Sequence, residues 1–167
     1  NTTKADAFII GAGGSAVASS WHLMMSLEKQ NRPTRIFIAD RDPARLDHIR
    51  EIHSKAKTTV PITYHLVDRA EDNDAIIAKL PAGSLIVNAT GLGKDAPGSP
   101  ITDDVSFPEH AIIWELNYRG DLVFLDQAKA QHTARHLQIE DGWIYFIHGW
   151  TQVIGEVFDV AIPTEGP

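Results

Sequence analysis

The feature that most constrains this chain is an apolar run that ends in glycines, Ala7-Phe8-Ile9-Ile10-Gly11-Ala12-Gly13-Gly14-Ser15-Ala16. The apolar part predicts a buried strand, and the small residues after it favour a helix that packs closely on a sheet. Glycine at positions 11 and 13 permits unusual backbone angles and lets the main chain approach a ligand. The first N–H groups of the helix then face outward, which favours phosphate oxygens. The stretch therefore predicts a pyrophosphate site, and the alternative is a strand–helix turn that binds nothing.

The rest of the chain repeats the same alternation, with strands and helices following one another six times. The expected strands are Ala7–Ile10, Thr34–Ala39, Ile62–Val67, Ser84–Ala89, Ala111–Leu116 and Leu137–Glu140. The expected helices are Ser15–Glu28, Pro43–Ser54 with Asp42 as N-cap, Asp72–Leu80, Asp121–His136 and Trp143–Val160, the last of them amphipathic. This alternation predicts an α/β, doubly wound, mainly parallel six-stranded sheet with helices on both faces, of the Rossmann type.

Composition limits the classes of partner. A length of 167 residues fits one domain, and the net charge of −7 argues against binding to a nucleic-acid backbone. There is no cysteine, and no apolar run approaches the roughly 20 residues of a membrane span. We therefore expect neither a nucleic acid nor a membrane as partner, and a cytoplasmic location. The chain begins at Asn1 with a strand almost at once, which suggests a domain cut from a longer protein.

A parallel sheet of this class binds ligands beyond the carboxyl ends of its strands. Asp40 follows the second expected strand, where a carboxylate can accept hydrogen bonds from both hydroxyls of an adenosine ribose and repel a 2′-phosphate. That position favours NAD as the cofactor. Arg41 and Arg45 stand next to it, and a guanidinium is the group that would hold the 2′-phosphate of NADP. We expect NAD, with NADP as the alternative.

Histidine spacing offers one further pattern. His132 and His136 stand four residues apart on an expected helix, which is a spacing that metal ligands use. No third ligand accompanies them, so we expect no metal site.

Several motifs together resemble one family. Gly11-Ala12-Gly13-Gly14-Ser15-Ala16 and Asn88-Ala89-Thr90-x-x-Gly93 resemble the cofactor domain of the shikimate and quinate dehydrogenases, which shows G-A-G-G-[AS]-x-[AR] and then N-[AST]-[ST]-x-x-G-M. Glu115-Leu116-Asn117-Tyr118 resembles the family's D-x-x-Y, and Asp141-Gly142 its D-G segment. The segment Asp40–Arg45 is a hybrid of the family's NADP and NAD patterns. The resemblance extends from about Ala7 to Phe158.

The resemblance implies a cofactor-binding domain of an enzyme that transfers a hydride reversibly between a secondary alcohol and a nicotinamide. The cofactor-binding residues that it implies are Gly11, Ala12, Gly13, Gly14, Ser15, Ala16, Asp40, Arg41, Arg45, Asn88, Ala89, Thr90, Leu116 and Gly142. The family's catalytic Lys and Asp lie in an N-terminal substrate domain, so we expect no catalytic residue in this chain. Tyr118, Gln152 and Lys94 are the expected contacts to a small-molecule substrate held by that other domain.

Departures from the family pattern leave the function open. Lys94 stands where the family usually has Met, and Gly149 where a Gln reaches the substrate, with Gln152 three residues on. Gly120 and Val123 replace the family's Pro and Thr. Two alternatives therefore remain, a dinucleotide-binding sensor module without catalysis and a dehydrogenase of the same fold with another substrate. The sequence contains no indication of the oligomeric state.

Overall fold

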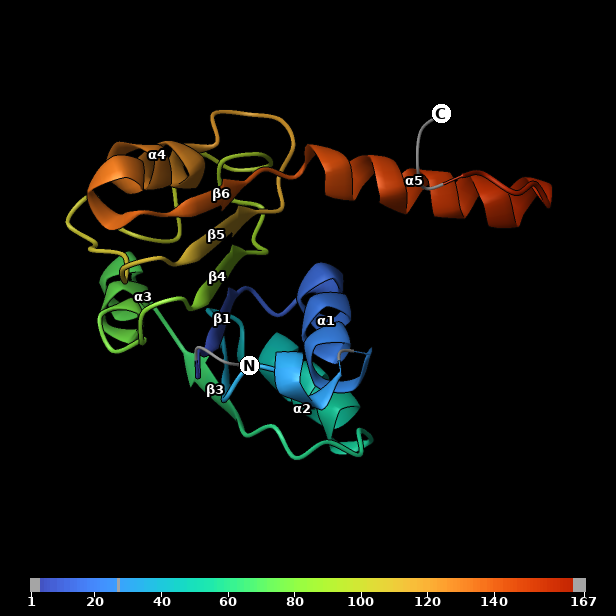
Figure 1. Ribbon diagram of the computed structural model, residues 1–167, viewed down its shortest axis with the longest axis horizontal. Helices are drawn as coiled ribbons and strands as arrows, with labels where there is room; N and C mark the ends of the chain where they lie inside the picture. Colours follow the sequence, from blue (N-terminus) through green and yellow to red (C-terminus); the bar gives the residue numbers. More distant parts are fainter. Residues whose placement is uncertain (1–3, 27, 164–167) are drawn as a thin grey trace.

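The computed structural model describes residues 4–26 and 28–163 (Figure 1). It contains a single six-stranded sheet in the order β3-β2-β1-β4-β5-β6, and every pairing between these strands is parallel. The strands are β1 (Ala7–Ile10), β2 (Ile36–Asp40), β3 (Ile62–Leu66), β4 (Leu85–Asn88), β5 (Ile112–Glu115) and β6 (Gln138–Glu140). The predicted α/β class and the Rossmann-type sheet are thus confirmed.

The sheet is covered on both faces because its central strands are apolar on both sides. Phe8 and Ile10 of β1 belong to one buried cluster, which α3 (Ala70–Ile77) and α4 (Val123–Arg135) complete. Ala7 and Ile9 belong to the opposite cluster, which α1 (Gly14–Trp21) and α2 (Pro43–Ser54) complete. Neighbouring residues of one strand therefore anchor helices on opposite faces, as the alternation of side chains along a strand requires.

Helix boundaries follow local hydrogen bonding. Asp42 is the predicted N-cap of α2, and its Oδ1 accepts a hydrogen bond from the Ala44 N–H at 2.9 Å. Helix α3 begins two residues before the expected Asp72, because the Asp72 carboxylate accepts the backbone N–H of Arg69 at 3.0 Å in a capping box. Helix α1 continues beyond Trp21 as a π-helical turn, η1 (His22–Ser26), followed by a 3₁₀ turn, η2 (Lys29–Asn31). Leu27, within the expected first helix, lies outside the described residues.

The link between β4 and β5 contains no helix over residues 89–111, which agrees with the sequence analysis, since no helix is expected between these two strands. This segment instead packs on the α3 and α4 face through the buried side chains of Ile101, Val105 and Phe107. Side chains of the two helices hold its backbone, since the Asn73 amide donates to the Pro100 carbonyl at 2.8 Å and the Phe107 N–H donates to Gln131 at 3.1 Å. Apolar anchors and side-chain bonds thus replace the missing crossover helix.

Helix α5 (Trp143–Phe158) leaves the carboxyl edge of the sheet and extends away from the body (Figure 1). None of its residues is buried, although the helix is rich in aromatic and branched side chains. No helix within residues 4–26 and 28–163 combines the length and the apolar character needed to cross a membrane.

A buried polar chain on the α1 and α2 face predicts a pH-dependent stability. The His53 ring lies between the Ser20 hydroxyl at 2.9 Å and the Tyr64 hydroxyl at 2.8 Å, and burial lowers its pKa below the ordinary 6.5. The folded protein therefore favours neutral His53. Its contribution to stability is complete above pH 6.5 and is lost as the pH falls below that value.

Urea unfolding at pH 8 and pH 5.5 should show this loss, and His53→Gln should reduce the difference between the two pH values. His48→Gln, an exposed substitution on the same helix, is the control and should retain the wild-type difference. An unchanged pH dependence in His53→Gln would contradict the assignment.

Candidate functional site

The carboxyl ends of the central strands meet at one edge of the sheet. Gly11 follows β1, Asp40 ends β2 and Asn88 ends β4, so three of the predicted site residues are neighbours there. β1 pairs with β2 on one side and with β4 on the other, and the order of the strands reverses between β1 and β4. Open parallel sheets bind ligands in the crevice at this point.

Gly11 is the tightest position of the glycine loop. Its N–H donates to the Ala39 carbonyl at 2.6 Å, and its φ of +110° is one that L side chains rarely adopt. A Cβ at this position would lie 2.7 Å from the Ala89 carbonyl oxygen. At Gly13 and Gly14, by contrast, a Cβ would meet nothing within 4 Å. The loop is therefore pressed against the end of β4 at its start and is open where α1 begins.

Asp40 holds this loop in place. Its Oδ2 accepts the Ala12 N–H at 2.7 Å and its Oδ1 accepts the Asp42 N–H at 2.9 Å, and the residue is only 8% exposed. The carboxylate predicted to face a ribose thus already accepts two backbone hydrogen bonds. Each of its oxygens has a further lone pair, so Asp40 can still accept a hydroxyl.

A pocket of about 370 Å³ opens beside Gly11 and Asp40. The lining includes Arg41 and Arg45, which follow β2, and Ala89, Thr90 and Gly91, which follow β4. The structure thus brings six of the predicted cofactor residues to one cavity: Gly11, Asp40, Arg41, Arg45, Ala89 and Thr90. Their role stays a prediction, and Ala12, Gly13, Gly14, Ser15 and Ala16 lie outside the lining, along the loop and the start of α1.

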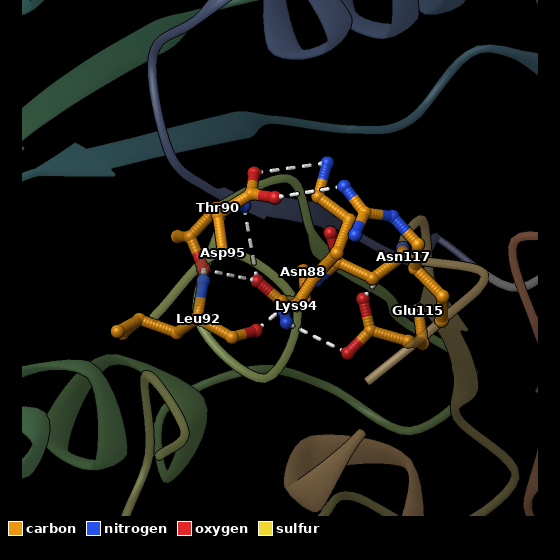
Figure 2. A network of polar contacts seen from close by, with 8 residues as sticks. Asn88, Thr90, Leu92, Lys94, Asp95, Glu115 and Asn117 are labelled. Carbon is orange, nitrogen blue, oxygen red and sulfur yellow. Dashed lines mark hydrogen bonds and ion pairs between the residues drawn. The ribbon is translucent and has the colours of Figure 1, made fainter. Parts of the chain in front are cut away.

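A network of buried polar side chains joins the ends of β4 and β5 (Figure 2). The Asn88 amide donates to Glu115 Oε2 at 2.7 Å, and Asn88 Oδ1 accepts both the N–H of Thr90 at 3.0 Å and its hydroxyl at 2.7 Å. The Asn117 N–H donates to Glu115 Oε1 at 2.8 Å, and the Asn117 amide donates to the Leu92 carbonyl at 3.1 Å. Asn88 therefore fixes the loop from within, rather than facing the pocket.

Glu115 is fully buried in this network, and burial raises the pKa of its carboxyl to about 7. The hydrogen bonds from Asn117 and Asn88 and the positive charge of Lys94 act in the opposite direction and lower this pKa. Lys94 itself pairs with Asp95 at 3.1 Å, and Arg119 reaches the other oxygen of Asp95 at 3.3 Å (Figure 2). Lys94, predicted as a substrate contact, thus lies in an ion-pair cluster beside a buried acid.

The remaining predicted residues come from the loop after β5, from the residue before α5 and from α5 itself. A Cβ at Gly142 would lie 2.2 Å from the Leu116 carbonyl oxygen, so only glycine lets the chain pass this closely. The Tyr118 ring stacks on Phe146 with centroids 3.9 Å apart. The Tyr145 hydroxyl reaches the Ser15 hydroxyl at 3.3 Å, which connects α5 to the glycine loop. Gln152 is exposed further along α5, away from these contacts.

Sequence reasoning missed some of the pocket lining. Arg69 and Asn73 line the pocket from the start of α3, and Asp95 lines it from the loop after β4. Arg69 follows the end of β3, so the rule that ligands lie beyond strand ends would have found it. Asn73 carries no such signal, because only the packing of α3 brings it to the cavity.

Metal ligation has little support in the described part of the chain, where no three His, Asp or Glu side chains are grouped to hold an ion. The His136 ring instead stacks on His110, with centroids 5.2 Å apart.

The sequence of this chain is similar to those of known dehydrogenases. No family model matches the chain. A shikimate dehydrogenase (NADP(+)) of Symbiobacterium thermophilum is 29% identical over 116 residues, which are 68% of this chain and 36% of that protein. The chain thus spans about a third of this curated relative.

Two solved structures share the fold. The shikimate 5-dehydrogenase of Listeria monocytogenes, in complex with shikimate and NAD, superposes with a TM-score of 0.62 over 86% of this chain and 47% of its own, at 20% identity. The quinate dehydrogenase of Corynebacterium glutamicum, in complex with NAD, gives 0.60 over 83% and 44%, at 21% identity. The predicted resemblance to the shikimate and quinate dehydrogenases is confirmed for this part of those proteins.

The close approach of Gly11 to β4 predicts that Gly11→Ala destabilises the fold. The strained φ alone costs about 1–3 kcal/mol, and the contact with Ala89 adds to this cost. Gly13→Ala is the matched control, since φ is −80° there and the added methyl group meets nothing, so its effect should stay within about 0.5 kcal/mol. Urea unfolding of both variants provides the comparison, and equal stabilities would refute the packing described for Gly11.

The raised pKa of Glu115 can be observed directly. In carbon-detected NMR the Glu115 carboxyl should titrate near pH 7, and its resonance is assigned by its absence in Glu115→Gln. Lys94→Met removes the positive charge that lowers this pKa, so the midpoint should move upward. In urea the midpoint should return to the ordinary value of 4.5. A folded-state midpoint near 4.5 would show that Glu115 is accessible to water.

Proposed function

We propose that this chain is the dinucleotide-binding domain of an NAD(P)-dependent oxidoreductase similar to the shikimate and quinate dehydrogenases. The observation that carries the proposal is the glycine loop at the reversal of strand order, pressed onto β4 at Gly11 and open at Gly13 and Gly14. The open side of the loop has room for a phosphate beside the first N–H groups of α1. The chain's resemblance to dehydrogenases supports the same assignment.

The residues present fit such a cofactor. The pyrophosphate would lie at the backbone of Gly13, Gly14 and Ser15, where no side chain blocks the start of α1. The adenosine half would enter the pocket between the Asp40 and Thr90 segments. The nicotinamide end would lie toward Leu116 and Gly142.

Arg41 and Arg45 bear on the choice between NAD and NADP. Arg41 and Arg45 line the pocket beside Asp40, and Arg45 also approaches Asp42 at 3.7 Å. A 2′-phosphate placed between the two guanidinium groups would make charge-assisted hydrogen bonds. Asp40 can accept a ribose hydroxyl as well, so both NAD and NADP remain within the proposal.

The bound nicotinamide supplies the hydride acceptor or donor of the reaction. What this chain adds is positioning. Backbone bonds from Asp40 hold the glycine loop, and the Asn88, Glu115 and Asn117 network holds the loop after β4. Tyr118, Lys94 and Gln152 are proposed to face a small hydroxy-acid substrate, and the proton transfer would be carried out by groups of another domain.

A second candidate is a dehydrogenase of the same fold that acts on another substrate. The observation that favours it is the ion-pair cluster of Lys94, Asp95 and Arg119, in which Lys94 stands where the family usually has Met. Turnover assays of the longer protein with shikimate, quinate and other secondary alcohols separate the two candidates.

Calorimetric titration with NADP⁺ and NAD⁺ tests the cofactor assignment. Arg41→Ala/Arg45→Ala should weaken NADP⁺ binding by roughly 10- to 100-fold, because two charge-assisted bonds are lost, and should change NAD⁺ binding by less than about threefold. Arg50→Ala is the control. Arg50 lies on α2, as Arg45 does, but its guanidinium pairs with Asp47 outside the pocket, so its loss should change neither affinity. The proposal fails if neither dinucleotide binds at millimolar concentration.

A further inference from the structure

One side chain at the start of α5 reaches the glycine loop. The Tyr145 hydroxyl donates to the Ser15 hydroxyl oxygen at 3.3 Å, and the two residues are 130 positions apart in the sequence. Tyr145 belongs to the first turn of α5, and Ser15 belongs to the first turn of α1. The Tyr145 hydroxyl therefore lies beside the segment that is proposed to hold the pyrophosphate.

Contacts around the first turn of α5 fix the place of the Tyr145 ring. Gly142, which precedes the helix, passes too close to the loop after β5 to admit a Cβ. The Tyr145 ring lies at 87° to the Trp114 ring with centroids 5.8 Å apart, and the neighbouring Phe146 stacks on Tyr118. Tyr145 is still 36% exposed, and its hydrogen bond to α1 is open to solvent. The ring is thus anchored on β5 while its hydroxyl remains within reach of a ligand.

The start of α1 offers backbone donors that have no partner. Gly13, at the N-cap, makes no side-chain capping bond, and the first turn contains no acidic residue. The first hydrogen bond of the helix runs from the Val17 N–H to the Gly13 carbonyl at 3.0 Å. Within residues 4–26 and 28–163, the N–H groups of Gly14, Ser15 and Ala16 therefore make no hydrogen bond.

The side-chain donors beside these N–H groups are hydroxyls. Neither the segment 11–20 nor α5 contains a Lys or an Arg. A phosphate oxygen carries negative charge, and hydrogen bonds to charged acceptors are about twice as strong as those between neutral groups. The bond from Tyr145 to the neutral Ser15 oxygen is therefore weaker than the bond that the same phenol would make to a phosphate.

We infer that Tyr145 is a binding residue for a diphosphate held at the start of α1. Its hydroxyl exchanges the Ser15 oxygen for a phosphate oxygen, and the Ser15 hydroxyl then donates to the same group. The diphosphate is thus held by backbone N–H groups of α1 on one side and by a side chain of α5 on the other. The inference rests on the proposed function, which supplies a dinucleotide as the source of that diphosphate.

Two other roles of the hydroxyl predict different effects when it is removed. A structural tether would join α5 to the loop with or without a ligand, so its loss would leave the affinity unchanged. A latch would cover the loop and would have to move before a dinucleotide enters, so its loss would raise the affinity. Only a donor to the ligand predicts a lower affinity, and the solvent exposure of the bond favours this role.

Tyr145→Phe tests the inference, because it removes the hydroxyl and keeps the ring that packs on Trp114. In calorimetric titrations of the 167-residue chain, NAD⁺, NADP⁺ and ADP-ribose should each bind the variant roughly 10-fold more weakly, the scale for a lost hydrogen bond to a charged group. Unchanged or tighter binding would overturn the inference. A loss with both dinucleotides but not with ADP-ribose would also overturn it, because the hydroxyl would then act at the nicotinamide end.

Two controls separate the lost donor from a general change of the site. Adenosine 2′-monophosphate lacks the diphosphate, so Tyr145→Phe should not alter its affinity, and an equal loss with this ligand would contradict the inference. Tyr64→Phe removes a phenol hydroxyl that contacts His53 at 2.8 Å, on the buried α1 and α2 face. This variant should lower the urea midpoint and leave every affinity unchanged, whereas Tyr145→Phe should leave the urea midpoint near that of the wild type.

Inorganic pyrophosphate distinguishes failure of this inference from failure of the proposed function. It carries the diphosphate alone, and the amide resonances of Gly14 and Ser15 in NMR spectra report its binding. Dinucleotide binding that Tyr145→Phe leaves unchanged removes only this inference. Pyrophosphate binding that Tyr145→Phe weakens, without binding of either dinucleotide, removes only the proposed function. Absence of binding by pyrophosphate and by both dinucleotides removes both.

Discussion

The hydrogen bond from the Ala12 N–H to the Asp40 carboxylate is the constraint on which the site depends. It joins the glycine loop after β1 to the end of β2, over 28 residues of sequence, and both partners are buried. Because the same carboxylate also accepts the Asp42 N–H, it aligns the loop with the start of α2. The Asp40 side chain thus holds the ends of β1 and β2 and the starts of α1 and α2 in place. It also holds one side of the pocket.

The opposite side of the pocket is held by side-chain hydrogen bonds to the backbone of a long loop. The segment between β4 and β5 has no helix, so its polar backbone groups need side-chain partners. Asn88 and Asn117 supply these partners at one end, where Glu115 holds both of them, and side chains of α3 and α4 supply partners further along. A buried acid with a raised pKa is the cost of this arrangement, because Glu115 has no water to stabilise its charge.

These two supports explain why the proposed function is one of positioning. The glycine loop and the loop after β4 are hydrogen-bonded to residues at the strand ends, whereas α5 extends from the same edge with apolar side chains exposed. A cofactor held between the loops would be placed beside the start of α5. The expectation that the catalytic Lys and Asp lie in another domain stays a prediction.

The sequence by itself determined the fold class and where the candidate site was expected. Apolar runs alternating with amphipathic segments predict a covered parallel sheet, and the glycines after Ile10 and the polar residues after Ala39 and Val87 fall at strand ends by that rule alone. These are local properties, since a strand and its turn are decided by neighbouring residues.

The tertiary structure decided which hydrogen-bond partners these side chains have. Asp40 accepts backbone N–H groups, Asn88 turns inward to Glu115, and Arg69 and Asn73 enter the pocket from α3. The exposure of the α5 face was likewise decided by packing, because an apolar stripe indicates that a helix is to be covered and says nothing of what covers it.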